Sequence, residues 1–175
     1  VEACPVIKAN CNGVYGCEVE EDATTGLISR LKRCGPSTEQ TRYLFEINKG
    51  LSQAASEANP YAVNNDLPAN KRRVPFQNMI YIGDGLTDIP SFSLVKQNGG
   101  TPFGVFNPND EKSAQRAMSA FLHTDRVASM HSPRYGKSDD LGALLRATVT
   151  RMARRIKAER TGVQVQDDVR LTPAD

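Results

Sequence analysis

Two aspartates, Asp84 and Asp88, are the residues of this chain whose type and spacing best suit chemistry. They follow the apolar run at 79–82, Met-Ile-Tyr-Ile, which predicts a buried parallel strand, and Gly83 and Gly85 allow a sharp turn directly after it. In open α/β sheets, ligands bind at the carboxyl ends of the strands. Two carboxylates four residues apart at such an end can hold a divalent cation.

The same residues also allow a purely structural interpretation. Gly-Asp-Gly at 83–85 is a common turn sequence, and Asp88 can cap a helix that begins after it. The order of the neighbouring elements favours a ligand site. A helix is predicted over 89–97 with a glycine-rich stop at 98–100, and a second strand is predicted over 103–106. The two acids therefore lie at the first turn of a β-α-β unit.

The run at 78–90, Asn-Met-Ile-Tyr-Ile-Gly-Asp-Gly-Leu-Thr-Asp-Ile-Pro, resembles the fourth motif of the haloacid dehalogenase (HAD) superfamily of phosphohydrolases. That motif is a hydrophobic strand followed by Gly-Asp-x-x-x-Asp. The resemblance, to a bacterial branch related to phosphoserine phosphatases, covers most of residues 13–156, and the segment 41–50 is similar to a helix of that branch.

This resemblance implies a Rossmann-like α/β fold, in which a parallel sheet lies between two layers of helices. It implies a small phosphorylated substrate and Mg²⁺ as the cofactor. Asp84 would bind the ion directly, and Asp88 would bind or orient it from close by, so that both are expected to be metal-binding and catalytic residues. Mg²⁺ on oxygen ligands would screen the charge of the phosphoryl group.

The superfamily's nucleophile, in contrast, has no counterpart in this chain. It is the first Asp of an Asp-x-Asp motif, and no such motif precedes Asp84. Asp22 is the nearest candidate, but it lies in a predicted hairpin loop and is interpreted as a turn residue. We therefore expect the chain to be the C-terminal part of a larger phosphatase, inactive alone, whose nucleophile, general acid/base and second-motif Ser or Thr lie upstream.

The expected core is correspondingly incomplete, because the first-motif strand is absent. In the superfamily that strand lies beside the fourth-motif strand, so the strand at 79–82 is predicted to have an unpaired edge. Such an edge exposes backbone donors and acceptors. We expect it to pair with the missing N-terminal segment or with another chain, giving an oligomer.

The third motif's Lys, which contacts the phosphate, aligns with Gln40. Lys49 and Lys71 are the candidate substitutes, and Lys49 is taken as the candidate phosphate-binding residue. Gln40 supports an alternative function, a degenerate, non-catalytic HAD-like scaffold used for interaction.

Composition is that of an ordinary globular protein. The 175 residues are 39% hydrophobic and 24% charged, which is enough for one core. A net charge of +2 does not indicate a nucleic-acid partner. No apolar run has membrane-spanning length and the N-terminus does not resemble a signal peptide, so we predict no membrane partner and a cytoplasmic location. The four cysteines do not form Cys-x-x-Cys pairs and are predicted to be reduced.

The predicted elements divide the chain into four segments. A hairpin of strands at 14–19 and 27–31, followed by a helix to about Gln53, makes up residues 1–53. Residues 54–75 are predicted to be a long polar insertion loop. The C-terminal half of the core is predicted over 76–160, including a helix at 110–122 and a strand at 127–130. Residues 161–175 are predicted to be a flexible tail.

A last helix, predicted over 138–160, has a basic face. Basic amphipathic helices bind nucleic acids or anionic membranes in some proteins, which makes such a binder a third candidate function. The helix also has an apolar stripe, which favours a core-covering role with a solvated basic face.

Overall fold

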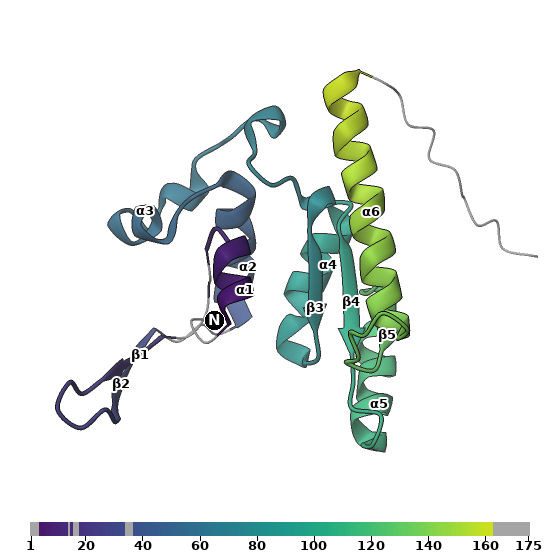
Figure 1. The fold of residues 1–175 in the computed structure, drawn as a ribbon, viewed down its shortest axis with the longest axis horizontal. Helices are drawn as coiled ribbons and strands as arrows, with labels where there is room; N and C mark the ends of the chain where they lie inside the picture. The colour runs from purple at the N-terminus through teal and green to yellow at the C-terminus, as the bar shows by residue number, and fades with distance from the viewer. Residues whose placement is uncertain (1–3, 14, 16–17, 34–36, 163–175) are drawn as a thin grey trace, which may run out of the picture. The chain divides into compact units, whose positions relative to one another are not determined.

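The computed structural model describes residues 4–13, 15, 18–33 and 37–162. Its contacts divide the chain after Met130 into two compact units, and each unit is described by itself. The protein is mixed α/β, with a two-stranded hairpin and a separate three-stranded sheet accompanied by helices (Figure 1). The predicted α/β class is therefore confirmed.

The hairpin consists of β1 (Glu18–Glu21) and β2 (Ile28–Arg33), which pair antiparallel as predicted. Residues 14, 16 and 17 of the predicted first strand lie outside the described residues. Asp22 closes the turn, because its Oδ1 accepts the backbone amides of Thr24 and Thr25 at 2.9 and 2.8 Å. These bonds confirm Asp22 as a turn residue.

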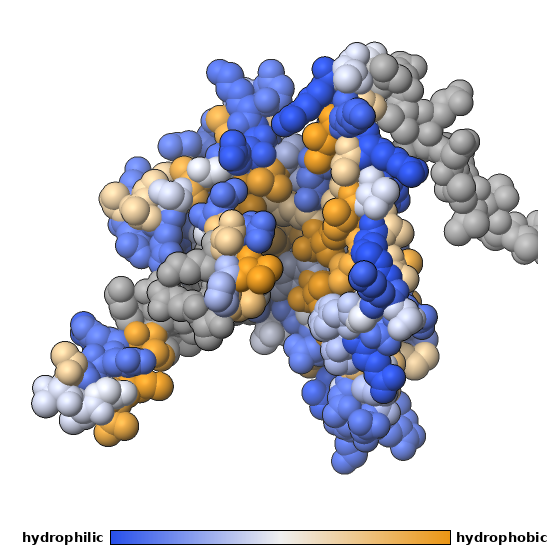
Figure 2. Space-filling view, viewed as in Figure 1, coloured by the Kyte–Doolittle hydropathy of each residue, from blue (hydrophilic) through white to orange (hydrophobic). Residues whose placement is uncertain are grey.

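The hairpin also carries exposed apolar side chains (Figure 2), which are those of Val19, Leu27 and Ile28. A two-stranded hairpin has no second layer of its own to cover such a face, and isolated hairpins are only marginally stable in water. The turn bonds of Asp22 therefore matter for the stability of this element.

On either side of the hairpin in the sequence lie the helices α1 (Pro5–Asn10) and α2 (Ser37–Lys49). The predicted helix to about Gln53 is too long, because Gly50 adopts a left-handed φ of 75° that ends α2. A side chain at Gly50 would also collide with Arg73, whose Cβ lies 2.7 Å from the position of an added Cβ. Gly50 is thus required by both its backbone angle and its contact.

Residues 54–75, predicted as a loop, contain short helical turns separated by irregular segments. They hold most of α3 (Gln53–Ala58) and the 3-10 turns η1 (Ala62–Asn64) and η2 (Ala69–Lys71). Ser52 caps α3 by accepting the amide of Ala55 at 3.2 Å. The capping Ser before a short Gln-Ala-Ala run is the sequence signal for this helix.

The β-α-β unit lies in the first compact unit and begins with η3 (Phe76–Asn78). It continues through β3 (Ile80–Gly83), η4 (Leu86–Asp88) and α4 (Ile89–Gln97) to β4 (Thr101–Val105). The two strands pair in parallel, from Ile80 opposite Thr101 to Gly83 opposite Gly104. The predicted strand-helix-strand order is confirmed within one or two residues.

The predicted helix at 110–122 is divided into α5 (Glu111–Ala117) and a π-helical turn, η5 (Met118–Leu122). Asp110 caps α5 through the amides of the second and third residues after it, at 3.0 and 3.3 Å. The strand predicted at 127–130 is β5 (Ser129–His131), which completes the sheet in the order β3-β4-β5. Among the described residues β3 is therefore an end strand, as predicted.

Two apolar clusters support this sheet, and Tyr81 of β3 packs against both. The first is centred on Phe92 of α4, whose ring meets those of Tyr81 and Phe121 edge-on, with centroids 5.5 and 5.2 Å away. The second consists of Phe76, Met79 and Val95. Aromatic edge-to-face contacts of this kind add to the stabilisation from burial alone.

The second compact unit contains α6 (Asp140–Thr161), which corresponds to the helix predicted at 138–160. Asp139 precedes it and accepts the amide of Gly136 at 2.9 Å. The helix ends at Gly162, which has a φ of 68°. Of the tail predicted over 161–175, residues 163–175 lie outside the described residues.

No helix of the described residues combines the length and apolar character needed to cross a lipid bilayer. α6 itself carries basic side chains along much of its length, and Figure 2 shows a hydrophilic band over it.

Candidate functional site

The loop that follows β3 holds both predicted acids and places them in different environments. Asp84 directly follows the strand and its side chain is exposed. Asp88 ends η4 and is only 7% exposed. The carboxyl end of a parallel strand thus presents one accessible carboxylate beside one that is enclosed by the loop.

The Asp88 carboxylate fastens this loop. Its Oδ2 accepts hydrogen bonds from the backbone amides of Asp84 and Gly85 at 3.0 and 2.9 Å. Its Oδ1 accepts a hydrogen bond from the Tyr81 hydroxyl at 2.6 Å. Asp88 occupies the position before α4, yet its side chain makes no capping bond to that helix. Asp88 is therefore not a side-chain cap of α4, because its carboxylate accepts hydrogen bonds from the loop that precedes the helix.

Gly83 allows this arrangement because the Asp88 side chain packs directly on its α-carbon. A Cβ added to Gly83 would lie 2.5 Å from Cγ of Asp88, closer than atoms can approach without a shift. At Gly85 the nearest atom, Oγ1 of Thr87, would lie 3.4 Å away. Of these two motif glycines, Gly83 is the one that the carboxylate requires.

Tyr81 is the residue of this site that the sequence analysis missed. Burial, followed by the hydrogen bond to Asp88, raises the pKa of its phenol well above the usual value. Tyr81 therefore remains a hydrogen-bond donor to Asp88 at neutral pH. The available signal is a hydroxyl-bearing residue within an otherwise apolar strand, two residues before the loop.

The two carboxylates differ in their capacity to bind a cation. A carboxylate has about four lone-pair positions, and three of those on Asp88 already accept hydrogen bonds. No hydrogen bond or ion pair is described for the Asp84 side chain, which leaves its oxygens accessible. Within the described part of the chain, no group of three or more His, Cys, Asp or Glu side chains is gathered as a metal site.

The predicted phosphate ligand, Lys49, is bonded elsewhere. Its Nζ donates to the carbonyl oxygen of Val63 at 2.6 Å and to that of Asn65. No bond to Asp84 or Asp88 is described for it. Lys71 ends η2 with an exposed side chain. Among the described residues, Asp84 and Asp88 are therefore hydrogen-bonded to each other through the Asp84 amide, and neither lysine is bonded to them.

Gln40, at the position of the superfamily's third-motif Lys, lies in α2 and is partly buried. Its Oε1 is buried and has no hydrogen-bond partner among the described residues. α2 contacts η4, so the helix that carries Gln40 runs beside the candidate loop.

The cysteines contribute no site in the described residues. Cys4 is partly exposed and Cys11 is exposed, and both are free thiols. Cys17 and Cys34 lie outside the described residues. The reduced state of the cysteines stays a prediction.

Comparisons with known proteins identify little beyond a distant relative. No protein-family profile matches the chain, and no solved structure matches it. An uncharacterised protein of Borreliella burgdorferi is 27% identical over 144 residues, which cover 81% of this chain and 46% of that protein. The chain therefore spans less than half the length of this relative.

Proposed function

We propose that this chain supplies the cation-binding part of the active site of a Mg²⁺-dependent phosphatase of the HAD type. The observation that carries the proposal is the loop after β3, where an exposed Asp84 lies beside an anchored Asp88. In the proposal, the rest of the HAD-like core and the nucleophile come from a segment outside these 175 residues, because no Asp-x-Asp precedes Asp84.

The two carboxylates of the loop are the kind of ligand that Mg²⁺ takes. This ion takes oxygen ligands and is usually held by one or two carboxylates together with waters and substrate phosphate. Asp84 supplies an accessible carboxylate, and Asp88 retains capacity for one further interaction. When bound, the ion would neutralise charge on the phosphoryl group during its transfer.

The neighbouring residues prepare Asp84 for this role. Asp88 bonds to the Asp84 amide, and Tyr81 in turn bonds to Asp88, so the backbone that carries the Asp84 carboxylate is fixed before a ligand arrives. A ligand held on a fixed backbone loses less conformational entropy on binding than one on a free loop. Tyr81 and Asp88 would thus act as positioning residues.

The free edge of β3 fits the proposed source of the nucleophile. Among the described residues, β3 is an end strand of the sheet, and Ile82 is 37% exposed. A strand added at this edge would end beside Asp84. A carboxylate on it could attack the phosphorus of a phosphomonoester and release the alcohol, after which water would hydrolyse the aspartyl-phosphate.

The test is Mg²⁺ binding and turnover in the full-length protein. Asp84→Asn should weaken Mg²⁺ binding, measured by calorimetry, at least about tenfold and abolish hydrolysis of p-nitrophenyl phosphate. Asp66→Asn, which removes another exposed carboxylate, is the matched control and should change neither. Equal Mg²⁺ affinity in the Asp84→Asn variant and the unmodified protein would contradict the proposal.

The second candidate is a non-catalytic scaffold of the same fold, and Gln40 favours it. An amide cannot replace the charge of a phosphate-binding Lys, and no bond joins Lys49 to Asp84 or Asp88 among the described residues. A full-length protein that binds Mg²⁺ but hydrolyses no phosphomonoester would select this candidate. Turnover that is lost in Asp84→Asn would select the enzyme.

A further inference from the structure

A cavity separate from the candidate loop lies in the first compact unit, against α2. Its volume is about 510 Å³, which is within the range of small-molecule sites. It is lined by residues of α2, of the segment around η1, and by one residue after η2: Thr41, Arg42, Phe45, Asn48, Lys49, Val63, Asn64 and Arg72. Neither Asp84 nor Asp88 belongs to this lining.

The charge of the lining is one-sided. Arg42, Lys49 and Arg72 are cationic, and none of the lining residues is an acid. Cations gathered around a concave surface produce a positive potential that attracts anions. The bonds that these side chains already make determine how much of that potential remains.

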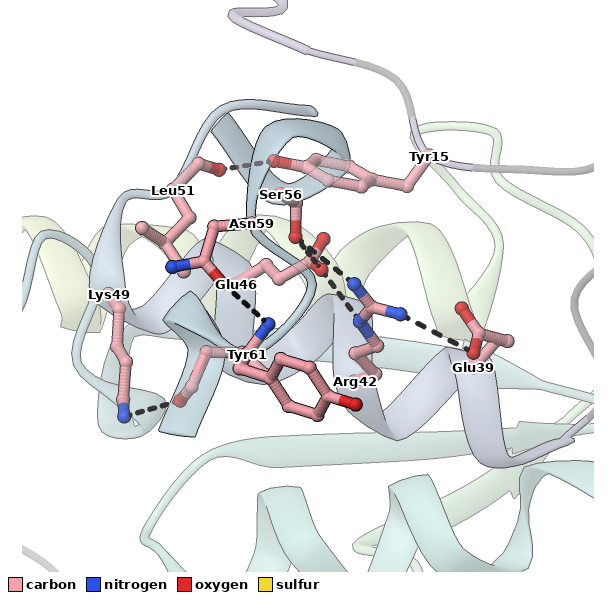
Figure 3. A network of polar contacts seen from close by, with 10 residues as sticks. Tyr15, Glu39, Arg42, Glu46, Lys49, Leu51, Ser56, Asn59 and Tyr61 are labelled. Carbon is pink, nitrogen blue, oxygen red and sulfur yellow. Dashed lines mark hydrogen bonds and ion pairs between the residues drawn. The ribbon is translucent and has the colours of Figure 1, made fainter. Parts of the chain in front are cut away.

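Arg42 is held in place by an acid behind it. Its Nε donates to Oε1 of Glu46 at 2.9 Å, and Glu46 is fully buried (Figure 3). Ser56 donates a short hydrogen bond to the same Glu46 oxygen. This network neutralises much of the charge of Arg42, but it also fixes its guanidinium, which has donors in a planar fork.

The other two cations have no acidic partner among the described residues. Lys49 bonds only to two backbone carbonyl groups, which orient its ammonium without cancelling the charge. Nε of Arg72 donates to the carbonyl oxygen of Leu67 at 3.4 Å, and no further bond is described for its guanidinium. A net positive charge therefore remains at the cavity.

The lining also has an apolar part. Phe45 is 38% exposed, and its ring is held edge-on against Phe76 with centroids 5.5 Å apart. Val63 lines the same cavity. A ring held by a neighbouring ring offers a fixed surface for a flat or apolar ligand group.

We propose that this cavity binds a small organic phosphate, whose phosphate group meets Lys49 and Arg72 and whose apolar part lies on Phe45. A phosphate dianion is favoured over a singly charged carboxylate because more than one cation faces the cavity without an acid. The proposal does not depend on the proposed phosphatase activity, because its residues are separate from the candidate loop.

The test uses phenylphosphonate, which cannot be hydrolysed as a phosphate ester, added to the full chain. We expect saturable binding by calorimetry, with the largest amide shifts by NMR at Val63 and Asn64. Phenol and inorganic phosphate should each bind at least about tenfold more weakly, because each lacks one of the two recognised groups. Equal binding of inorganic phosphate and phenylphosphonate would overturn the role of Phe45.

Two substitutions change the charge of the cavity without touching its buried network. Asn64→Asp adds an acid at an exposed lining position, and Arg72→Gln removes a cation. Each should weaken phenylphosphonate binding at least about tenfold. The matched controls are Asn109→Asp and Arg116→Gln, at exposed positions outside the cavity, which should leave it unchanged.

One further variant separates this proposal from the proposed phosphatase site. Asp84→Asn should leave phenylphosphonate binding intact, whatever it does to Mg²⁺ binding or turnover. Binding that persists in Asn64→Asp and Arg72→Gln, or amide shifts confined to residues 83–88, would overturn the cavity as the binding site.

Discussion

The hydroxyl of Tyr81 donates a hydrogen bond of 2.6 Å to Oδ1 of Asp88, and so ties the interior of strand β3 to the end of the loop that follows it. The other oxygen of Asp88 is bonded to the loop backbone. A single carboxylate thus links a strand side chain to two backbone amides.

Tyr81→Phe removes the hydroxyl and keeps the ring. We expect a loss of about 1.5–3 kcal/mol in the free energy of unfolding, the usual contribution of a hydrogen bond to a charged group. Urea denaturation measures this loss. Tyr135→Phe is the control, because Tyr135 is 54% exposed, and its loss should be within about 0.5 kcal/mol. Equal stability of the two variants would mean that the bond contributes nothing.

Gly83→Ala places a methyl group against the Asp88 carboxylate, which must then move. We expect a destabilisation of about 1–3 kcal/mol, as for other overpacked sites, and altered amide shifts at Asp84 and Gly85. Gly85→Ala is the control in the same loop, since its nearest contact would be 3.4 Å. A larger loss in the free energy of unfolding for Gly85→Ala than for Gly83→Ala would contradict the prediction.

The buried Glu46 makes Arg42 important for stability. Arg42→Met leaves the Glu46 carboxylate without its cation, and we expect a loss of about 3 kcal/mol in the free energy of unfolding. Arg30→Met is the comparison, because Arg30 pairs with Glu20 where the two side chains are 73% and 45% exposed, and it should cost less than about 1 kcal/mol. Replacing Glu46 by Gln together with Arg42→Met should recover part of the loss.

Asp22 gives the hairpin a predictable response to acid. Hydrogen bonds from the amides of Thr25 and Thr24, and then from the Thr25 hydroxyl, lower the pKa of Asp22 from its usual value of 3.8. Because the folded-state pKa is depressed, the stabilisation is present above the unfolded pKa and is lost as pH falls through the folded one. NMR titration of the Asp22 carboxyl carbon measures the pKa. Asp22→Asn should remove the acid-induced shift changes at the two Thr amides.

The free edge of β3 predicts self-association of the isolated 175-residue chain. Unpaired donors and acceptors on an end strand invite pairing with another chain. We expect a concentration-dependent rise in mass by analytical ultracentrifugation. Ile82→Lys, at a position that is 37% exposed, should reduce this association because charged side chains oppose edge pairing. A monomer at every concentration would contradict the prediction.

The sheet and the position of the two acids could be predicted because the residues that indicate them are neighbours in the sequence. The apolar run at 79–82, the following glycines and the helix stop at 98–100 lie next to one another in the sequence. The end of α2 was misplaced because the helical pattern continues to Leu51, while the backbone of Gly50 already turns left-handed. The helix α3 was missed because its six residues are too few to show a helical pattern of apolar residues.

The polar networks could not be predicted, because they join residues whose proximity depends on the fold. A Glu in a helix, such as Glu46, is usually expected to face solvent. Glu46 is instead buried, and it accepts a hydrogen bond from Ser56, ten positions later. The cavity likewise combines α2 with Val63 and Arg72. No spacing rule relates these positions, since the intervening segment folds as short irregular turns.

Tyr81 packs against both apolar clusters of the sheet while it holds Asp88. The position of the Asp88 carboxylate therefore depends on residues that no motif contains. A substitution that displaces the ring of Phe92 would displace the Tyr81 ring with it. It would thereby change the hydrogen bond between Asp88 and the Asp84 amide. Variation in the apolar interior can in this way adjust the loop while every polar residue of the motif stays the same.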